Sequence, residues 1–292
     1  MSSLTLALPP HFRVPAFLNF HGRDQHAISE QVEGNVLRKA VTLDGRPCLL
    51  ALDFNQPGQV RSTARTLTRT ALSRQTRAML GLDQPVNTFE QAVTGQATPL
   101  GQLVGRQRGL RVPQSATPFE ALSWAIIGQQ ISVSAATAIR RRFIQLAGQA
   151  RVSGLRCYPD AAAVSQLDAS ALRSVGFSVS KAETLLTVSQ RCCEHALLPD
   201  AFHSEADAQR TEQALLGIRG LGPWSVNYTL LRGYSYLDGS LHGDVAVQKA
   251  LQRLLGLKTR PAAKATRDWL AAFTPWRALV AAHLWQSLNV QA

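Results

Sequence analysis

Over the first hundred residues, short stretches alternate between apolar and polar positions, as half-buried strands do. Residues 36–43 alternate in part, Asp44-Gly45 is a hairpin turn signal, and residues 48–54 are the returning strand. Apolar positions then follow helical spacing over residues 63–80. The pattern predicts a small α+β domain with an antiparallel sheet at residues 1–112, ending in a basic linker at 105–113.

Beyond this linker the periodicity predicts helices only. Thr117, Pro118 and Glu120 form a capping box with proline in the first turn. The helix that they open is predicted to reach residue 147, with a break near Gly128. Further helices are predicted over residues 168–175, 180–196, 206–216, 223–232, 244–255, 261–273 and 276–288. The fold class is therefore α+β: the N-terminal sheet domain is followed by an all-helical domain at residues 113–292.

One turn between two predicted helices has the composition of a phosphate-binding hairpin. Gly220 and Gly222 permit positive φ and leave no Cβ over the turn, and Pro223 suits the first position of the next helix. Free backbone amides at such a helix start bind phosphate. The pattern favours a helix-hairpin-helix at about residues 206–232; the alternative is an ordinary helix end and loop.

Composition narrows the class of partner. The formal net charge is +12, the sequence pI is about 10.4, and only five of the 31 basic residues are lysines. Arginine forks match phosphate oxygens, so a polyanion is the expected partner. A basic surface without such a partner, or a bias toward arginine codons, would give the same figures.

Several other classes are excluded. The chain is 45% hydrophobic and 17% charged, which excludes a disordered protein. The spacing of Cys48, Cys157, Cys192 and Cys193 fits neither a zinc site nor an iron–sulfur cluster. No signal peptide and no run of 18 apolar residues is visible, so we expect a cytoplasmic protein without a membrane partner.

Twenty-two residues after Gly222 comes Asp244, and this spacing completes a family signature. The hairpin, the Gly/Pro-rich loop and the aspartate resemble those of the DNA-3-methyladenine glycosylase II group of the helix-hairpin-helix DNA glycosylase superfamily. Further motifs are similar to that group: Phe119-Glu120-Ala121, Ile126-Ile127-Gly128-Gln129-Gln130-Ile131-Ser132, Trp224-Ser225-Val226-Asn227-Tyr228, Pro275-Trp276-Arg277 and His283-Leu284-Trp285. The resemblance covers the chain from about residue 4 and implies excision of alkylated bases from duplex DNA by N-glycosidic cleavage.

Aromatic residues near the hairpin suit the bases that this chemistry removes. An enzyme that acts on a paired base must flip it out of the duplex. An N3- or N7-alkylated purine is a cation, which aromatic faces attract by about 0.5–2 kcal/mol per ring. The resemblance implies that Trp224, Tyr228 and Trp276 line the base pocket; the alternative is that they pack between helices.

Asp244 is the predicted catalytic residue. Glycosidic cleavage builds positive charge on the sugar, which a carboxylate beside C1′ can stabilise, or the carboxylate can activate water. Asp244 is also suited to cap a following helix, and both roles are compatible. Asp238 precedes Gly239 and is interpreted as a turn residue. Bifunctional relatives carry a nucleophilic lysine where this chain has Trp224, so no lyase activity is expected.

The remaining predicted contacts are to the DNA backbone and to the gap left by the flipped base. Amides of Gly220, Gly222 and Ser225 are expected to bind phosphate. The family's apolar wedge residue is matched by Gln130, with Ile131 beside it, and the sequence leaves open which of the two enters the duplex.

The resemblance also implies a monovalent cation, Na⁺ or K⁺, at the hairpin. Carbonyls of Leu216, Ile218 and Leu221 are its predicted ligands, and no other cofactor is expected. We expect a monomer that binds duplex DNA containing alkylated bases. Two alternatives remain: a non-catalytic DNA-binding module, which would not need Asp244 and the aromatic residues, and a glycosylase for oxidised purines, which would carry the hairpin lysine.

Overall fold

The computed structural model describes residues 1–95, 97–148, 150–195 and 197–289. Its N-terminal part is a five-stranded antiparallel sheet in the order β1-β5-β4-β3-β2. The strands are β1 (Ser2–Ala7), β2 (Glu30–Glu33), β3 (Val36–Leu43), β4 (Arg46–Asp53) and β5 (Gln59–Ala64). Helix α1 (Val14–His21) connects β1 to β2, and α2 (Arg69–Leu80) follows β5. The predicted α+β class with an N-terminal antiparallel sheet is confirmed.

The β3–β4 hairpin forms as predicted, whereas the helix predicted from residue 63 is wrong over its first turns. Asp44 and Gly45 both have positive φ, at 50° and 68°, as a tight two-residue hairpin requires. Thr63 and Ala64 belong to β5, which pairs with β1 on one side and β4 on the other. The helix starts only after Thr68, whose hydroxyl accepts the amide of Ala71. Two flanking strands supply pairing that local periodicity cannot show.

The C-terminal part is mostly helical, and the predicted helices are confirmed to within a few residues. They are α5 (Pro118–Gly128), α6 (Val133–Ala147), α8 (Ala169–Ser174), α9 (Val179–His195), α10 (Glu205–Leu216), α11 (Pro223–Tyr234), α12 (Val245–Leu255), α13 (Ala263–Ala271) and α14 (Arg277–Asn289). The break near Gly128 separates α5 from α6.

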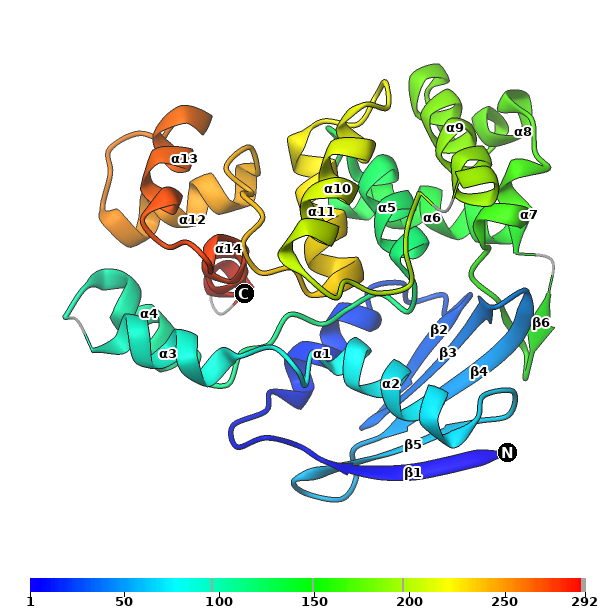
Figure 1. The fold of residues 1–292 in the computed structure, drawn as a ribbon, viewed down its shortest axis with the longest axis horizontal. Coiled ribbons are helices and arrows are strands. Elements are labelled where there is room, and N and C mark those ends of the chain that lie inside the picture. Colours follow the sequence, from blue (N-terminus) through cyan, green and yellow to red (C-terminus); the bar gives the residue numbers. More distant parts are fainter. Residues whose placement is uncertain (96, 149, 196, 290–292) are drawn as a thin grey trace.

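Some elements were not predicted. Helices α3 (Val86–Thr94), α4 (Pro99–Arg106) and α7 (Ala161–Ser165) are short, and α4 takes up the start of the predicted linker. The prediction of helices only is also wrong, because β6 (Arg151–Val152) and β7 (Leu155–Arg156) form a small hairpin. This hairpin lies beside the large sheet (Figure 1), where Tyr158 bridges to Val41. Partners distant in sequence stabilise such short segments.

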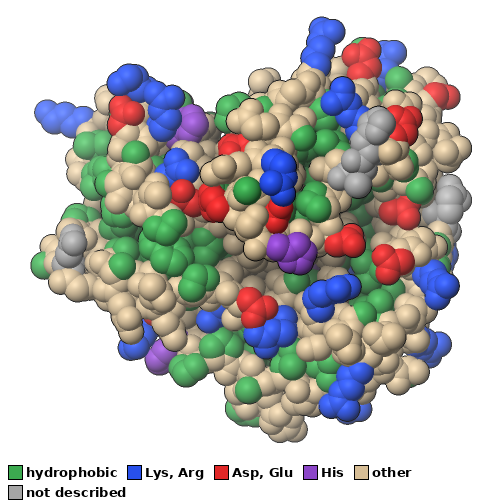
Figure 2. Space-filling model, in the orientation of Figure 1, with side chains coloured by type: hydrophobic (Ala, Val, Ile, Leu, Met, Phe, Trp, Pro, Cys, Tyr) green, Lys and Arg blue, Asp and Glu red, His purple; other side chains and the backbone are tan. Residues whose placement is uncertain are grey.

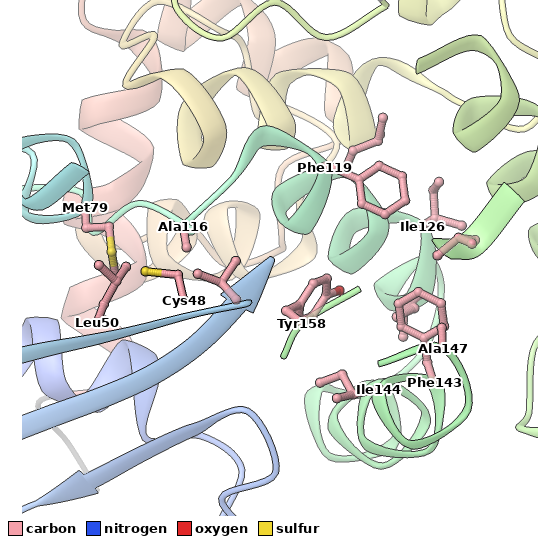
Figure 3. Packing of buried hydrophobic residues seen from close by; sticks show 14 of the residues in the cluster. Cys48, Leu50, Met79, Ala116, Phe119, Ile126, Phe143, Ile144, Ala147 and Tyr158 are labelled. Atoms are coloured by element: carbon pink, nitrogen blue, oxygen red, sulfur yellow. The ribbon is translucent and has the colours of Figure 1, made fainter. Parts of the chain in front are cut away.

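Two large apolar cores, beside a small third one, organise the described part of the chain. The larger lies between the sheet and helices α5–α11 and contains Leu50, Met79, Phe119 and Phe143 (Figure 3). The second joins α3 and α4 to α12 and α14, so a segment from the first half of the chain packs beside the C-terminal helices (Figure 1). Helix α11 contributes to both cores. The predicted domain boundary at residue 112 stays a prediction.

A buried ionic cluster joins the sheet to the helices. Lys39 of β3 contacts Glu30 of β2 and donates to Glu120 of α5 at 2.7 Å, and Arg140 of α6 lies 3.1 Å and 3.0 Å from these carboxylates. His21 of α1 lies 3.2 Å from Glu30. Burial alone would raise the pKa of Glu30, but Lys39 and Arg140 hold it well below its usual range. The cluster pairs two cations with two anions, so none of these four buried charges is left without a counter-ion.

The surface is mixed in character. On the face shown in Figure 2, basic side chains are spread widely, and an apolar patch lies in the hollow between α12–α13 and α3–α4. Among the described residues, no helix is long and apolar enough to cross a membrane.

Candidate active site

Asp244 stands at the start of α12, where its carboxylate accepts four hydrogen bonds. Oδ1 accepts the amides of Ala246 at 2.8 Å and Val247 at 3.0 Å, so the aspartate caps the helix as expected. The other two donors are indoles: Trp224 Nε1 lies 2.8 Å from Oδ2, and Trp285 Nε1 lies 3.2 Å from Oδ1. All four donors are neutral. None of the ion pairs in the described part of the chain involves Asp244.

An aromatic group surrounds this carboxylate. Trp224 and Tyr228 lie one turn apart on α11 with ring centroids 5.4 Å apart, and the centroids of Tyr228 and Trp285 are 6.2 Å apart. Tyr228 is buried, whereas Trp224, Trp285 and Asp244 are half-buried. The structure thus brings together three rings from α11 and α14 beside a partly open carboxylate.

Trp276 does not belong to this group by its contacts. Its ring packs against Phe89 of α3, with centroids 6.0 Å apart, in the second core. Trp276 directly precedes α14, whereas Trp285 lies within that helix, eight residues after its first residue, or about 12 Å at the rise of an α-helix. Sequence reasoning chose the tryptophan of the Pro-Trp-Arg motif and missed Trp285, although the His283-Leu284-Trp285 motif was recognised. Only the packing of α14 against α12 shows which tryptophan reaches Asp244.

Asp238 is more than a turn residue. Its buried carboxylate accepts two hydrogen bonds from the guanidinium of Arg277, from Nε and Nη2 at 2.9 Å each. Arg277 is the first residue of α14, so this bidentate pair fixes the start of the helix that carries Trp285. Asp238 therefore supports the site without touching Asp244.

The hairpin has the expected helix start, and its two glycines have different conformations. Gly220 has φ = 93°, and a Cβ there would lie 2.0 Å from Thr184 Oγ1, so glycine is required. Gly222 instead has an extended backbone with φ = −101° and is the N-cap of α11. The positive φ that glycine permits is therefore not used at this position, because the N-cap of a helix has an extended backbone. Nothing lies within 4 Å of a Cβ built on Gly222, so this glycine leaves open space over the amides of α11.

The wedge loop, residues 129–132, lies beside the hairpin. Gln130 has φ = 56° and is exposed, and Ile131 is 38% exposed. Val133, at the start of α6, is 63% exposed. Gln129 Nε2 donates to the carbonyl of Gly220 at 2.9 Å. The predicted wedge residues therefore stand at the surface, next to the predicted phosphate-binding turn.

A pocket extends from Tyr228 toward the N-terminal domain. Its empty volume is about 430 Å³, including space open to solvent, and Phe20, Arg23 and Trp124 line it together with Tyr228. The guanidinium of Arg23 lies 4.6 Å from the ring centroid of Phe20. Sequence reasoning missed Phe20 and Arg23 because they come from α1 and the turn after it, some 200 residues before Tyr228.

Of the residues whose carbonyls are predicted to bind a cation, Leu216 is the last residue of α10, and Ile218 and Leu221 lie in the hairpin turn. The amide of Leu221 donates to the carbonyl of Ile218 at 3.1 Å, which leaves that oxygen a second lone pair. No group of three or more His, Cys, Asp or Glu side chains suited to a metal occurs among the described residues.

Comparison with known proteins identifies the family. The model of the HhH-GPD superfamily of base excision DNA repair proteins matches residues 123–275, just over half of the chain. The chain belongs to this superfamily. The matched region includes the wedge loop, the hairpin and Asp244, and the resemblance predicted from the motifs is confirmed.

Individual relatives agree with this membership. A DNA-3-methyladenine glycosylase of Bacillus subtilis is 21% identical over 98% of this chain and 97% of its own length. The DNA-3-methyladenine glycosylase 2 of Escherichia coli is 29% identical over 64% of this chain and 63% of its length.

Solved structures share the fold. The 3-methyladenine DNA glycosylase of Archaeoglobus fulgidus superposes with a TM-score of 0.82 at 22% identity, and 97% of each chain is covered. An 8-oxoguanine glycosylase/lyase of Clostridium acetobutylicum, in complex with double-stranded DNA, gives 0.74 at 13% identity over 96% of this chain and 93% of that one. The fold itself is therefore shared by proteins with different named activities.

Proposed function

We propose that this protein is a monofunctional DNA glycosylase that flips alkylated bases out of duplex DNA and hydrolyses their N-glycosidic bond. The observation that carries the proposal is the carboxylate of Asp244, which is held by neutral donors alone at the edge of an aromatic group. The names of the relatives support the same substrate class, 3-methyladenine and similar lesions.

The chemistry follows from that arrangement. The bond between C1′ and the base nitrogen breaks with its electron pair moving to the base, so a cationic methylated purine leaves as a neutral molecule. The sugar becomes an oxocarbenium-like cation, which the charge of Asp244 stabilises. Water then adds to C1′ and loses a proton, leaving an abasic site. Trp224, Tyr228 and Trp285 stack against the extruded base and attract its positive charge.

DNA is bound in this proposal through the hairpin. Because α11 starts at Pro223, the amides of Trp224 and Ser225 point out of its N-terminus as donors for phosphate oxygens. Together with those of Gly220 and Gly222 they bind the backbone without reading base sequence. A monovalent cation held by carbonyls of this turn would add to the attraction. The protein acts as a monomer in the cytoplasm.

Lyase activity is not part of the proposal. A lyase of this superfamily needs a lysine beside C1′, and the corresponding residue here is Trp224, whose indole instead donates to Asp244. None of the five lysines lies in residues 215–244.

The deciding experiment is base release from methylated duplex DNA, followed by chromatography of the free bases. We expect release of 3-methyladenine and 7-methylguanine, and no covalent adduct when the reaction is quenched with borohydride. Binding of this DNA without release would favour a non-catalytic module. Release of 8-oxoguanine with a trapped adduct would favour an oxidised-purine glycosylase/lyase.

A further inference from the structure

A side-chain amide joins the wedge loop to the hairpin. Gln129 Nε2 donates to the carbonyl of Gly220 at 2.9 Å and to the hydroxyl of Ser225 at 2.8 Å. These residues lie more than 90 positions apart in sequence. Ser225 is 2% exposed and lies next to Trp224 in the first turn of α11. One side chain thus connects the predicted wedge loop with the predicted phosphate-binding turn.

Helix α9 supports both partners of this connection. Lys181 Nζ donates to the carbonyls of Ile127 and Gln129 at 2.8 Å each, which closes the C-terminal end of α5 and fixes the backbone at the start of the wedge loop. One turn along α9, Thr184 Oγ1 lies 3.1 Å from the carbonyl of Arg219 in the hairpin. The wedge loop and the hairpin are therefore held against the same helix.

We infer that Gln129 is a positioning residue that couples phosphate binding at the hairpin to base extrusion by the wedge loop. To displace a base, the loop must push against a duplex that is held in place elsewhere, and the hairpin is the element that holds it. The link through Gln129 transmits that push between two neighbouring segments. The inference rests on the proposed function.

The backbone of the loop shows why a link is needed. Gln130 has φ = 56°, a conformation that is unfavourable for a residue with a side chain. It follows directly on Gln129, whose carbonyl and side chain are both held. Without these hydrogen bonds, Gln130 can relax to a negative φ. The side chains of Gln130 and Ile131 would then point in other directions than they do in this loop.

The test compares Gln129→Ala on paired and extrahelical lesions. In single-turnover reactions, we expect the variant to release 7-methylguanine from paired duplex DNA about tenfold more slowly than the wild type, the effect of losing one to two hydrogen bonds. On a lesion placed in a single-base bulge, which is already partly extruded, the loss should be less than threefold. Gln145→Ala, on the exposed face of α6, is the matched control and should be unchanged on both.

A merely structural role would give a different result. Equal slowing on paired and bulged DNA, or no slowing on either, overturns the inference. Lys181→Met provides a second variant with the same expected pattern, and Lys181→Arg should restore the rate because it can still donate to both carbonyls. Thermal melts of each variant confirm that it is folded.

Failure of the proposed function would be visible separately. If the wild type releases no base, the proposed activity is wrong. Extrusion can still be followed by the fluorescence of 2-aminopurine placed opposite an abasic analogue, without any cleavage. We expect a smaller fluorescence increase with Gln129→Ala than with the wild type at saturating protein, and an equal increase overturns the inference.

Discussion

The buried pair Glu30 and Glu120 and the single carboxylate of Asp244 differ in the kind of partner that binds them. Glu30 and Glu120 lie in the interior between the sheet and the helices, and Lys39 and Arg140 neutralise them. Asp244 is half-buried and accepts only neutral donors, two backbone amides and two indoles. The charges of the interior cluster cancel one another, whereas no cationic side chain among the described residues forms an ion pair with Asp244.

This difference has a physical reason. A buried charge without a counter-ion is costly, so an interior that contains carboxylates must supply cations. Neutral dipoles solvate a carboxylate without cancelling its charge, and they hold it in a fixed orientation. Such a carboxylate is suited to meet a cation that exists only in the transition state. The comparison therefore separates a region that stabilises the fold from one that can do chemistry.

The largest expected effect is on stability, from Lys39→Met. The substitution leaves two buried carboxylates with only Arg140 as counter-ion, so we expect the free energy of unfolding to fall by about 3–5 kcal/mol. Urea denaturation of the wild type and the variant measures it. Lys264→Met breaks the exposed pair with Asp268 and should cost at most about 0.5 kcal/mol. If Lys39→Met lowered the free energy of unfolding by less than about 1 kcal/mol, the ion pairs of Lys39 would not be needed to stabilise the two buried carboxylates.

Asp244→Asn tests the other side of the comparison. Asparagine caps a helix about as well as aspartate, so α12 should be preserved while the charge is lost. We expect base release to slow by about 10²–10³ or more, with binding to an abasic-analogue duplex changed by less than tenfold. Asp168→Asn, at the N-cap of α8, removes a charge from an equivalent position and should have no effect on release. Near wild-type turnover by a folded Asp244→Asn variant would remove Asp244 from the mechanism.

Acid should destabilise the interior through its histidines. Burial lowers the pKa of His283 to about 3, so the unfolded chain, with a pKa near 6.5, takes up the proton first. The contribution of neutral His283 to the free energy of unfolding is complete above pH 6.5. It is lost as the pH falls toward 3, by about 1.4 kcal/mol per pH unit.

Urea titrations between pH 7 and 5, above the carboxylate range, measure this slope. His283→Gln should reduce the slope of unfolding free energy against pH by the contribution of one proton, because glutamine does not titrate. Glutamine can still donate to Gln107 Oε1, as the imidazole Nδ1 does at 2.8 Å. Burial also lowers the pKa of His21, which should account for part of the remaining slope. A slope unchanged by His283→Gln would mean that this histidine is not held neutral.

The smallest effect sharpens the description of the aromatic group. Trp285→Ala should slow release of cationic 7-methylguanine more than release of neutral hypoxanthine, by about 0.5–2 kcal/mol of barrier. Trp276→Ala, which removes a ring packed on Phe89, should change both rates in the same proportion. Single-turnover rates on the two lesions give the ratio. If Trp276→Ala slowed release of the cationic lesion selectively and Trp285→Ala did not, Trp276 would be the tryptophan that stacks on the base, as the motif predicted.

Much of this architecture was predictable because it depends on local signals. The β3–β4 hairpin needs two residues that tolerate positive φ, and Asp44-Gly45 supplies them. Helices α5, α6, α8, α10 and α12 begin after residues whose side chains cap them, and their limits came out nearly correct, whereas the short helix α7 was not predicted. The failures lie where partners are distant: β5 looked helical, and β6 and β7 were not visible, since strand pairing depends on segments that local periodicity does not show.

The sequence alone determined the superfamily and the hairpin, and it singled out Asp244 as the catalytic candidate, because each depends on residue types at fixed spacing within a short segment. Only the tertiary structure decided that Trp285 and not Trp276 reaches this carboxylate, that Phe20 and Arg23 line a pocket next to Tyr228, and that Gln129 holds the hairpin. Each of these contacts joins segments many residues apart. Their geometry is set by how helices pack across two cores, and no local pattern records that packing.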